Sequence, residues 1–361
     1  MGRNESETVV RTGSGLTVSK IFTYIRMMKL WHLLPILAMV AIGCSAGNET
    51  AKTPEGEKPS TTQEFKVALI TPGKVNDSGW NALAYDGLQA IKSDMSATVD
   101  NQEAAGPKAQ EAMRAYAQKG YNLVFGHGYE YNEPGAEIAA DFPDTVFVSS
   151  SGGKTAKNAG AFRFYLEQGF YLAGVMAAKM SKTGKIGSVA VIDVPSIAST
   201  IKAYEAGAKA ANPKIVIIPP VFFGNEGDIA GAKKATESVL AQGADFIIHQ
   251  ANSAAQGVFD ACKERGANAF GSNSDQNENP SGAVVASATI IAKPAFLALA
   301  KQVQEKKYEG AVSLFGMEQD AIDFVINPTF TAKVPPELVK ELEQMKADIK
   351  SGKLVVPKAE F

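Results

Sequence analysis

The sequence predicts an α/β protein with parallel sheets in two lobes, and three recurring features support this. From residue 65 onward, Ala-rich amphipathic segments alternate with short runs of Val, Ile and Phe, and a Gly stands between them. The Gly supplies the left-handed backbone that ends a helix, and the apolar runs are typical of strands buried on both faces. Helices that alternate with such strands predict parallel sheets covered by helices.

Two blocks of this repeated unit follow one another along the chain. The first runs from Lys66 to about Phe162, and the second from Lys185 to about Gly271. Beyond the second block the sequence predicts, in order, a strand at 283–289, a helix at 294–305, irregular strands within 312–325 and an amphipathic helix at 336–350.

These blocks predict two doubly wound lobes with a deep cleft between them. We expect residues 65–163 and 284–361 to form lobe 1, and residues 164–283 to form lobe 2. The chain would pass between the lobes near residues 163–165 and again near residues 277–283. Because ligands of open parallel sheets bind at the carboxyl ends of the strands, the cleft is the expected ligand site.

The N-terminal residues predict a lipoprotein signal peptide rather than a membrane span. The apolar run at 30–42 is too short to cross a hydrocarbon core of about 30 Å, which needs ~20 residues. It follows Arg26 and Lys29, ends just before Cys44, and resembles a bacterial lipoprotein signal. An uncleaved anchor with a chance cysteine is the alternative.

Acylation of Cys44 would leave everything after it outside the cytoplasm. Residues 1–43 would be the leader, with Met27 or Met28 as the true start, and residues 44–64 would be a lipidated, flexible tether. The protein would then be held to the bacterial membrane by its lipid alone, on the periplasmic side or at the cell surface.

Composition narrows the class of partner. The net charge is −2, with 36 basic and 38 acidic residues and no long charged block, so nothing directs the protein to nucleic acid.

After Cys44 only Cys262 remains, and we expect it to be a buried structural thiol because it has no second cysteine to pair with. We expect a monomer.

The predicted strand ends carry polar and aromatic side chains but few basic ones. They are rich in Asn, Ser, Gln, Asp, Gly and aromatic rings, and they lie at 71–80, 126–129, 149–152, 193–196, 222–225, 250–253 and 271–276. A phosphate or carboxylate would need Arg or Lys, so these groups favour an uncharged, planar, hydroxyl-bearing ligand. A nucleobase or nucleoside fits this description.

No motif indicates catalysis, a metal or a cofactor. The histidines after the leader, His127 and His249, have no metal-ligand spacing, and no G-x-S-x-G elbow is present. The sequence at Gly153 resembles the end of a phosphate loop, but Val148 stands where that loop needs a glycine. Each histidine either contacts the ligand or has a structural role.

Several motifs in the same order resemble the basic membrane lipoprotein (BMP) family, the PnrA-like substrate-binding proteins of ABC transporters. The resemblance spans about residues 65–357 and rests on Asp77-Ser-Gly-Trp80-Asn81, Gln168-Gly-Phe-Tyr171-Leu-Ala-Gly174, Lys185-Ile-Gly187, Tyr204-Glu-Ala-Gly207, Gln242-Gly-Ala-Asp245, Ser274-Asp275-Gln276 and Lys350-Ser-Gly352. It implies a type I periplasmic-binding-protein fold with a three-strand hinge, an ABC permease and ATPase as partners, and a purine nucleoside as ligand.

The resemblance also implies roles for residues. Asp77 would hold the edge of the base, Trp80 would stack on the ring where the family usually has Phe, and Asn81 would support the pocket. A second aromatic face would come from near Phe222 or Phe223. The full set of expected ligand-binding residues is Asp77, Trp80, Asn81, His127, Tyr129, Phe164, Phe223, Asn225, Asn252, Asn273 and Asp275.

Two departures from the family pattern leave the ligand open. Asn273 stands where many members have the Asp thought to grip the ribose, and the lysine common near Ile290 is absent. A neutral contact is weaker than a charge-assisted one, so a free nucleobase is an alternative to a nucleoside. Two further hypotheses are a sensor for another small polar ligand, such as a sugar, and a nucleoside hydrolase using Asp77 and Asp275. Of these hypotheses, we expect that the protein binds its ligand without acting as an enzyme.

Overall fold

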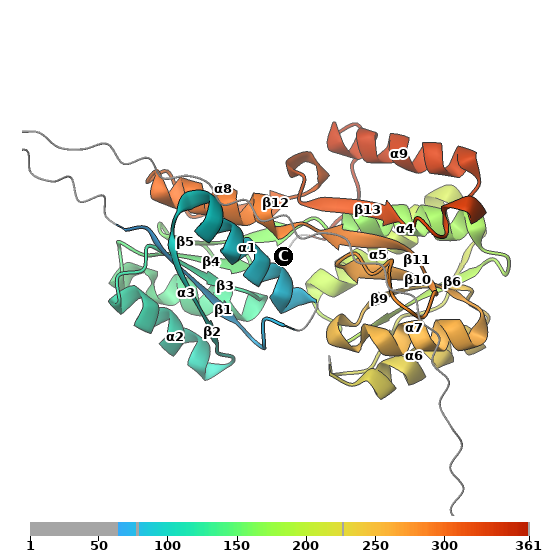
Figure 1. Cartoon of the computed structure of the whole chain (residues 1–361), viewed down its shortest axis with the longest axis horizontal. Coiled ribbons are helices and arrows are strands. Elements are labelled where there is room, and N and C mark those ends of the chain that lie inside the picture. The colour runs from blue at the N-terminus through green and yellow to red at the C-terminus, as the bar shows by residue number, and fades with distance from the viewer. Residues whose placement is uncertain (1–63, 77–78, 226, 360–361) are drawn as a thin grey trace, which may run out of the picture. The chain divides into compact units, whose positions relative to one another are not determined.

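Helices and strands alternate along the computed structural model, which describes residues 64–76, 79–225 and 227–359. The predicted leader and tether, including Cys44, lie outside these residues. The described part of the chain contains no helix that is both long and apolar enough to span a membrane. The predicted α/β class is confirmed, because the strands form two largely parallel sheets flanked by helices (Figure 1).

Among the described residues, the first sheet contains six strands, all paired in parallel. In spatial order they are β12 (Val312–Phe315), β5 (Ala159–Phe164), β4 (Val146–Ser150), β3 (Leu123–Gly126), β1 (Lys66–Thr71) and β2 (Thr98–Glu103). Its helices are α1 (Trp80–Met95), α2 (Pro107–Gln118), α3 (Asn132–Ile138) and α8 (Ala292–Gln304). Phe125 and Phe162 of the sheet contact Phe296 of α8, which places the core between the sheet and this helix.

In the same described part of the chain, the second sheet contains seven strands, and one pair is antiparallel. The order is β13 (Ile322–Ile326), β11 (Val284–Ile290), β10 (Asn268–Asn273), β9 (Phe246–Gln250), β6 (Lys185–Ala190) and β7 (Val216–Ile217), with β8 (Val221–Phe222) also paired to β6. Its helices are α4 (Glu167–Met180), α5 (Pro195–Ala211), α6 (Ile229–Ala241), α7 (Ala255–Arg265) and α9 (Pro336–Lys350).

Two glycines allow α4 and α5 to pack closely. A Cβ atom at Gly174 would lie 2.0 Å from the carbonyl oxygen of Tyr204, and one at Gly207 would lie 2.1 Å from that of Tyr171. Any larger residue would push the helices apart. Both glycines belong to motifs that the family resemblance rests on, and close helix packing is the physical reason for them.

Within the residues that the structure describes, three crossovers connect the two sheets, as a three-strand hinge requires. They follow β5, β11 and β12, and hydrogen bonds join them to one another. Tyr165 N donates to Phe315 O at 2.8 Å, and Ile291 N donates to Ala321 O at 2.8 Å. Because the crossovers are bonded side by side, the lobes can rotate about one narrow region.

The tail of the chain is divided between the sheets, unlike the predicted return of residues 284–361 to lobe 1. Only α8 and β12 join the first sheet, whereas β11 and β13 lie in the second sheet and α9 packs on α4. The reason is that every residue of β11 is buried, so this strand needs neighbours on both edges, and β10 and β13 supply them. Residues 277–283, expected as a crossover, instead form the loop between β10 and β11.

Candidate functional site

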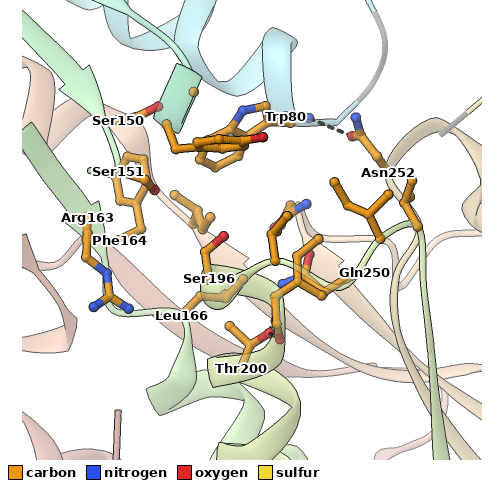
Figure 2. Close-up of a pocket in the computed structure, with 18 of the residues that line it drawn as sticks. Trp80, Ser150, Ser151, Arg163, Phe164, Leu166, Ser196, Thr200, Gln250 and Asn252 are labelled. Carbon is orange, nitrogen blue, oxygen red and sulfur yellow. Dashed lines mark hydrogen bonds between the residues drawn. The ribbon is translucent and has the colours of Figure 1, made fainter. Parts of the chain in front are cut away.

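A cavity of about 250 Å³ lies where residues from both lobes meet at the carboxyl ends of strands (Figure 2). We define two walls by the residues used below. The first-lobe wall consists of Trp80, Tyr129, Ser150, Ser151 and Phe164, and the second-lobe wall consists of Ser196, Thr200, Gln250, Asn252 and Asn273. The cavity is therefore at the place that the parallel topology predicts for a ligand.

The indole of Trp80 is held in the first-lobe wall by His127. The two rings are stacked with centroids 3.9 Å apart, and His127 Nε2 lies 2.8 Å from the carbonyl oxygen of Trp80. His127 Nδ1 lies 3.0 Å from Ser150 Oγ. Since a carbonyl can only accept, Nε2 carries the proton, and in the neutral ring Nδ1 accepts from the Ser150 hydroxyl. His127 is thus a buried support behind Trp80 and does not itself line the cavity.

Aromatic rings come to the cavity from the first lobe. Phe164 meets Trp80 edge to face at a centroid distance of 6.4 Å, a favourable geometry for two aromatic groups. Tyr129 stands at the cavity with 59% of its surface exposed. The first-lobe wall can therefore offer ring faces to a planar ligand.

The second-lobe wall offers amides and hydroxyls. Gln250 ends β9 and its Nε2 donates to Thr200 Oγ1 at 3.2 Å, while Thr200 Oγ1 donates to the carbonyl of Ile197 at 2.8 Å. These bonds orient the Gln250 amide. Of the non-glycine residues with positive φ in the described chain, Ser151, Asn252 and Asn273 line this cavity, with φ of 77°, 47° and 68°. Such backbone strain concentrates at binding sites.

His249 precedes Gln250 and is fixed as a neutral ring. Ala251 N donates to His249 Nδ1 at 3.2 Å, and His249 Nε2 donates to Gln276 Oε1 at 3.1 Å. Burial lowers the pKa of His249 to about 4. His249 does not line the cavity, so it supports the end of β9 rather than contacting a ligand.

The two lobes are hydrogen-bonded across the site. The backbone N–H of Trp80, the first residue of α1, donates to Asn252 Oδ1 of the second lobe at 2.9 Å (Figure 2). Residues 172 positions apart in the sequence are joined in this way next to the stacking residue.

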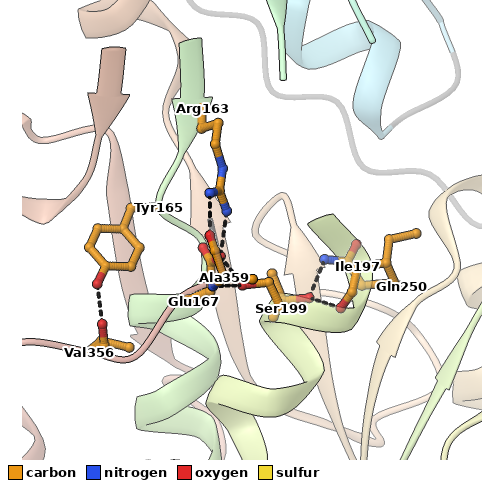
Figure 3. Close-up of polar contacts among 9 residues, drawn as sticks. Arg163, Tyr165, Glu167, Ile197, Ser199, Gln250, Val356 and Ala359 are labelled. Atoms are coloured by element: carbon orange, nitrogen blue, oxygen red, sulfur yellow. Dashed lines mark hydrogen bonds and ion pairs between the residues drawn. The ribbon is translucent and has the colours of Figure 1, made fainter. Parts of the chain in front are cut away.

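A buried ion pair lies where the walls meet, and sequence reasoning missed it. Arg163 Nη2 lies 2.7 Å from Glu167 Oε1, and the two side chains are only 7% and 1% exposed (Figure 3). Ser199 Oγ donates to the same carboxylate oxygen at 2.6 Å. Both charged residues line the cavity, but their charges cancel, so the pair itself adds no net charge. The available signal was the spacing of four between two charges in an otherwise apolar stretch.

The C-terminal segment completes this network. Arg163 Nη1 donates to Ala359 O at 2.9 Å, and Ala359 N donates to Ser199 Oγ at 2.9 Å (Figure 3). The Tyr165 hydroxyl donates to the carbonyl of Val356, which is buried. The segment therefore joins the first crossover to α5, the helix that carries Ser196 and Thr200.

The structure brings together only some of the residues predicted from the sequence. Trp80, Tyr129, Phe164, Asn252 and Asn273 line the cavity. His127 lies behind Trp80, and Asn81 is a buried residue of α1 that does not line the cavity. Asp77 lies outside the described residues.

Three further predicted residues lie outside this cavity. Phe223 packs against the hydrophobic core of the second lobe. Asn225 is exposed and its Oδ1 accepts from Gly227 N at 2.9 Å. Asp275 is exposed, and its Oδ1 accepts from Asn277 N at 3.0 Å.

The described residues also bear on metal and thiol chemistry. Across the described ranges, no group of three or more His, Cys, Asp or Glu side chains could hold a metal ion. The prediction for Cys262 is confirmed, because the thiol is buried and burial raises its pKa to about 12. A thiol of this kind is unreactive at neutral pH.

Two lobes that enclose a cavity and are joined by three crossovers define a solute-binding protein of the type I periplasmic fold. The chain belongs to the family described as ABC transporter substrate-binding protein PnrA-like, which it matches over residues 65–360. This family comprises solute-binding proteins rather than enzymes. The chain is therefore an extracytoplasmic substrate-binding protein whose role involves a small-molecule ligand and a transporter.

Similar proteins agree with this assignment. A purine-binding protein from Brucella abortus (strain 2308) is 30% identical over 301 residues, which cover 81% of this chain and 83% of that protein. Basic membrane protein A1 from Borrelia garinii subsp. bavariensis is 25% identical over 339 residues, which cover 92% of this chain and 96% of that protein. The structure of an ABC transporter solute-binding protein from Conexibacter woesei has a TM-score of 0.64 at 23% identity, covering 81% of this chain and 99% of that one.

Proposed function

We propose that this protein binds a neutral purine nucleoside or nucleobase in the cavity and presents it, as a monomer, to an ABC permease and its ATPase. The observation that carries the proposal is the indole of Trp80, held by His127 in the wall of a cavity shared by both lobes. The name of the Brucella relative supports a purine as the ligand class. A lipid on Cys44 would hold the protein at the membrane.

The two walls suit the two kinds of group on a purine. Stacking of a base on an aromatic side chain is worth about 1–3 kcal/mol, and Trp80 supplies the ring. The amides of Gln250, Asn252 and Asn273 both donate and accept, which matches the ring nitrogens and exocyclic groups of a base. The cavity of about 250 Å³ is at the small end of ligand sites and so favours a small molecule.

Glu167 supports a nucleoside over a free base. Its Oε2 is buried and has no hydrogen-bond partner in the described part of the chain. A carboxylate oxygen beside the cavity can accept from a sugar hydroxyl, and a charged acceptor makes the stronger bond. Asp77, to which the family resemblance assigns the edge of the base, would add a second carboxylate.

The ligand would be bound by closure of the lobes, without any covalent step. A ligand that enters the open cleft stacks on Trp80, and rotation about the crossovers then brings the second-lobe wall onto it. The ligand stabilises the closed form because only there does it contact both walls. The closed form is the one that a permease would recognise.

The experiment uses Trp80 as the reporter. It is the only tryptophan after residue 31, so the emission of a protein that starts at Cys44 comes from the proposed site. Adenosine, guanosine, inosine, their free bases and ribose should be titrated while emission is followed, with calorimetry on the Trp80→Phe variant as a control for the reporter. We expect saturable changes with purines, and with nucleosides at lower concentration than bases. If no purine compound binds by either method, the ligand assignment is wrong.

A further inference from the structure

We propose that Asn252 is a positioning residue that caps helix α1 from the opposite lobe and thereby locks Trp80 in place when the lobes close. The inference rests on the proposed function for the identity of the ligand. The cap itself consists of protein groups alone, so it can be tested without any ligand.

The first turn of α1 needs acceptors for its backbone N–H groups, as every helix N-terminus does. The residue at the N-cap position is Gly79, whose side chain has no oxygen to offer. An Asn side chain is among the best caps known, because its oxygen accepts from a first-turn N–H. Asn252 Oδ1 plays this part at 2.9 Å from Trp80 N, although it belongs to a different lobe.

The two partners belong to elements that the hinge can separate. Helix α1 packs on α8 and on the first sheet. Asn252 begins the short 3₁₀ helix Asn252–Ala254, which contacts α6 and α7 of the second lobe. Rotation about the crossovers therefore breaks or forms this hydrogen bond, whereas the contacts of His127 with Trp80 lie within the first lobe and persist.

The backbone of Asn252 is also suited to the cap. Its φ of 47° is a left-handed conformation, which costs energy for most residues but little for Asn. In this conformation the amide oxygen of Asn252 points toward the backbone N–H of Trp80 in α1. Asn252 would thus couple closure to the stacking residue, and loss of the cap should speed ligand release more than it slows ligand entry.

The test compares Asn252→Gly with Asn252→Asp. Gly keeps the left-handed backbone but removes the acceptor, so it isolates the cap. Asp keeps the acceptor and adds a charge that a helix N-terminus favours, but it loses the amide donor that a direct ligand contact could use. Asn212→Gly is the matched control, because Asn212 Oδ1 also accepts a backbone N–H, from Lys214 at 3.0 Å, and lies about 18 Å along α5 from Thr200.

Hydrogen exchange of the residue 80 amide, in ligand-free protein and with adenosine, is the first measurement. We expect exchange to be about two- to tenfold faster in Asn252→Gly than in wild type, with Asn252→Asp and Asn212→Gly close to wild type. Equal exchange at residue 80 in the Gly and Asp variants, both with and without adenosine, would overturn the proposal.

Stopped-flow emission with adenosine is the second measurement. Asn252→Gly should dissociate about two- to tenfold faster with nearly unchanged association, and Asn252→Asp should restore the slow dissociation. Fast dissociation in both variants would mean that Asn252 acts through a ligand contact and not as a cap. If wild-type protein does not respond to adenosine or any other purine, the ligand assignment fails while the exchange measurement still decides the cap.

Discussion

The first-lobe wall and the second-lobe wall of the cavity have different chemistry. The first presents Trp80, Tyr129 and Phe164, and its key ring is held by a stacked, hydrogen-bonded His127. The second presents amides and hydroxyls whose positions depend on strand ends and on strained backbone. Under the proposed function, this difference means that the ligand would be stacked from one side and hydrogen-bonded from the other, rather than held between two rings.

Phe223 shows why the second ring is missing from the described cavity. The sequence places Phe222 and Phe223 at the end of an apolar run, as it does for Phe164. However, β8 is a two-residue strand paired only with β6, and Phe223 turns onto the core of its own lobe. A residue after a short edge strand is free to follow the local core, while Phe164 ends β5, which is paired on both edges and leads into the cavity.

The largest expected effect comes from breaking the buried Arg163–Glu167 ion pair, which lies where the two walls meet. Glu167→Gln removes one partner of the buried ion pair with Arg163, which should lower the free energy of unfolding by about 3–5 kcal/mol. Glu264→Gln is the matched control, because its pair with Lys233 at 2.7 Å lies at the surface and should contribute little to stability. Equal midpoints for both variants in urea unfolding would contradict the buried role of the pair.

The next effect depends on pH and comes from His249, which supports the end of β9, the strand that carries Gln250 of the second-lobe wall. Burial lowers the pKa of His249 to about 4, from about 6.5 in the unfolded chain. Between pH 4 and pH 6.5, His249 is protonated in the unfolded state but not in the folded state. The contribution of His249 to the free energy of unfolding is therefore full above about pH 6.5 and falls as the pH drops toward 4. The loss should be on the order of 3 kcal/mol, since each pKa unit corresponds to about 1.4 kcal/mol.

Urea unfolding of wild type and His249→Gln between pH 4 and 7 provides the measurement. The variant should lose most of this dependence on pH, even though its stability at neutral pH is lower. If the free energy of unfolding changes equally with pH in both proteins, the pH dependence arises from a group other than His249.

The smallest effect tests the asymmetry of the walls directly. Trp80→Ala should weaken purine binding by about 1–3 kcal/mol, or roughly fivefold to 150-fold, through loss of stacking. Phe223→Ala should change affinity less than about twofold but should lower stability, because that ring packs on a core. Calorimetry measures the affinity of both variants without relying on Trp80 emission. A larger loss of affinity for Phe223→Ala than for Trp80→Ala would mean that the ligand is held between two rings after all.

Much of the fold follows from the sequence because the signals are local. Apolar runs without alternation predict buried parallel strands, and Gly266, with φ of 65°, ends α7 as the pattern indicates. The predicted crossover near Arg163 is also present. The sheet to which β11 and β13 belong was not predictable from local signals. A strand that is buried on both faces fits equally well beside several partner strands.

The site was predictable only in part for a similar reason. Asn273 ends β10, Asn252 comes just after β9 and Trp80 begins the helix that follows β1, so the topology brings them to the cavity. The Arg163–Glu167 pair and its bond to Ala359 depend on where the tail folds back, which no local pattern encodes. Asp275 shows the converse, since a residue at a strand end can turn outward to cap its own loop.

The C-terminal segment has a consequence for how the protein is made. Ala359 is bonded to Arg163 and Ser199, partners 196 and 160 positions earlier in the sequence. A growing chain can form the early strands of both sheets before residue 359 has been synthesised. The hydrogen-bond network that joins the first crossover to α5 can therefore be completed only after synthesis has reached this segment.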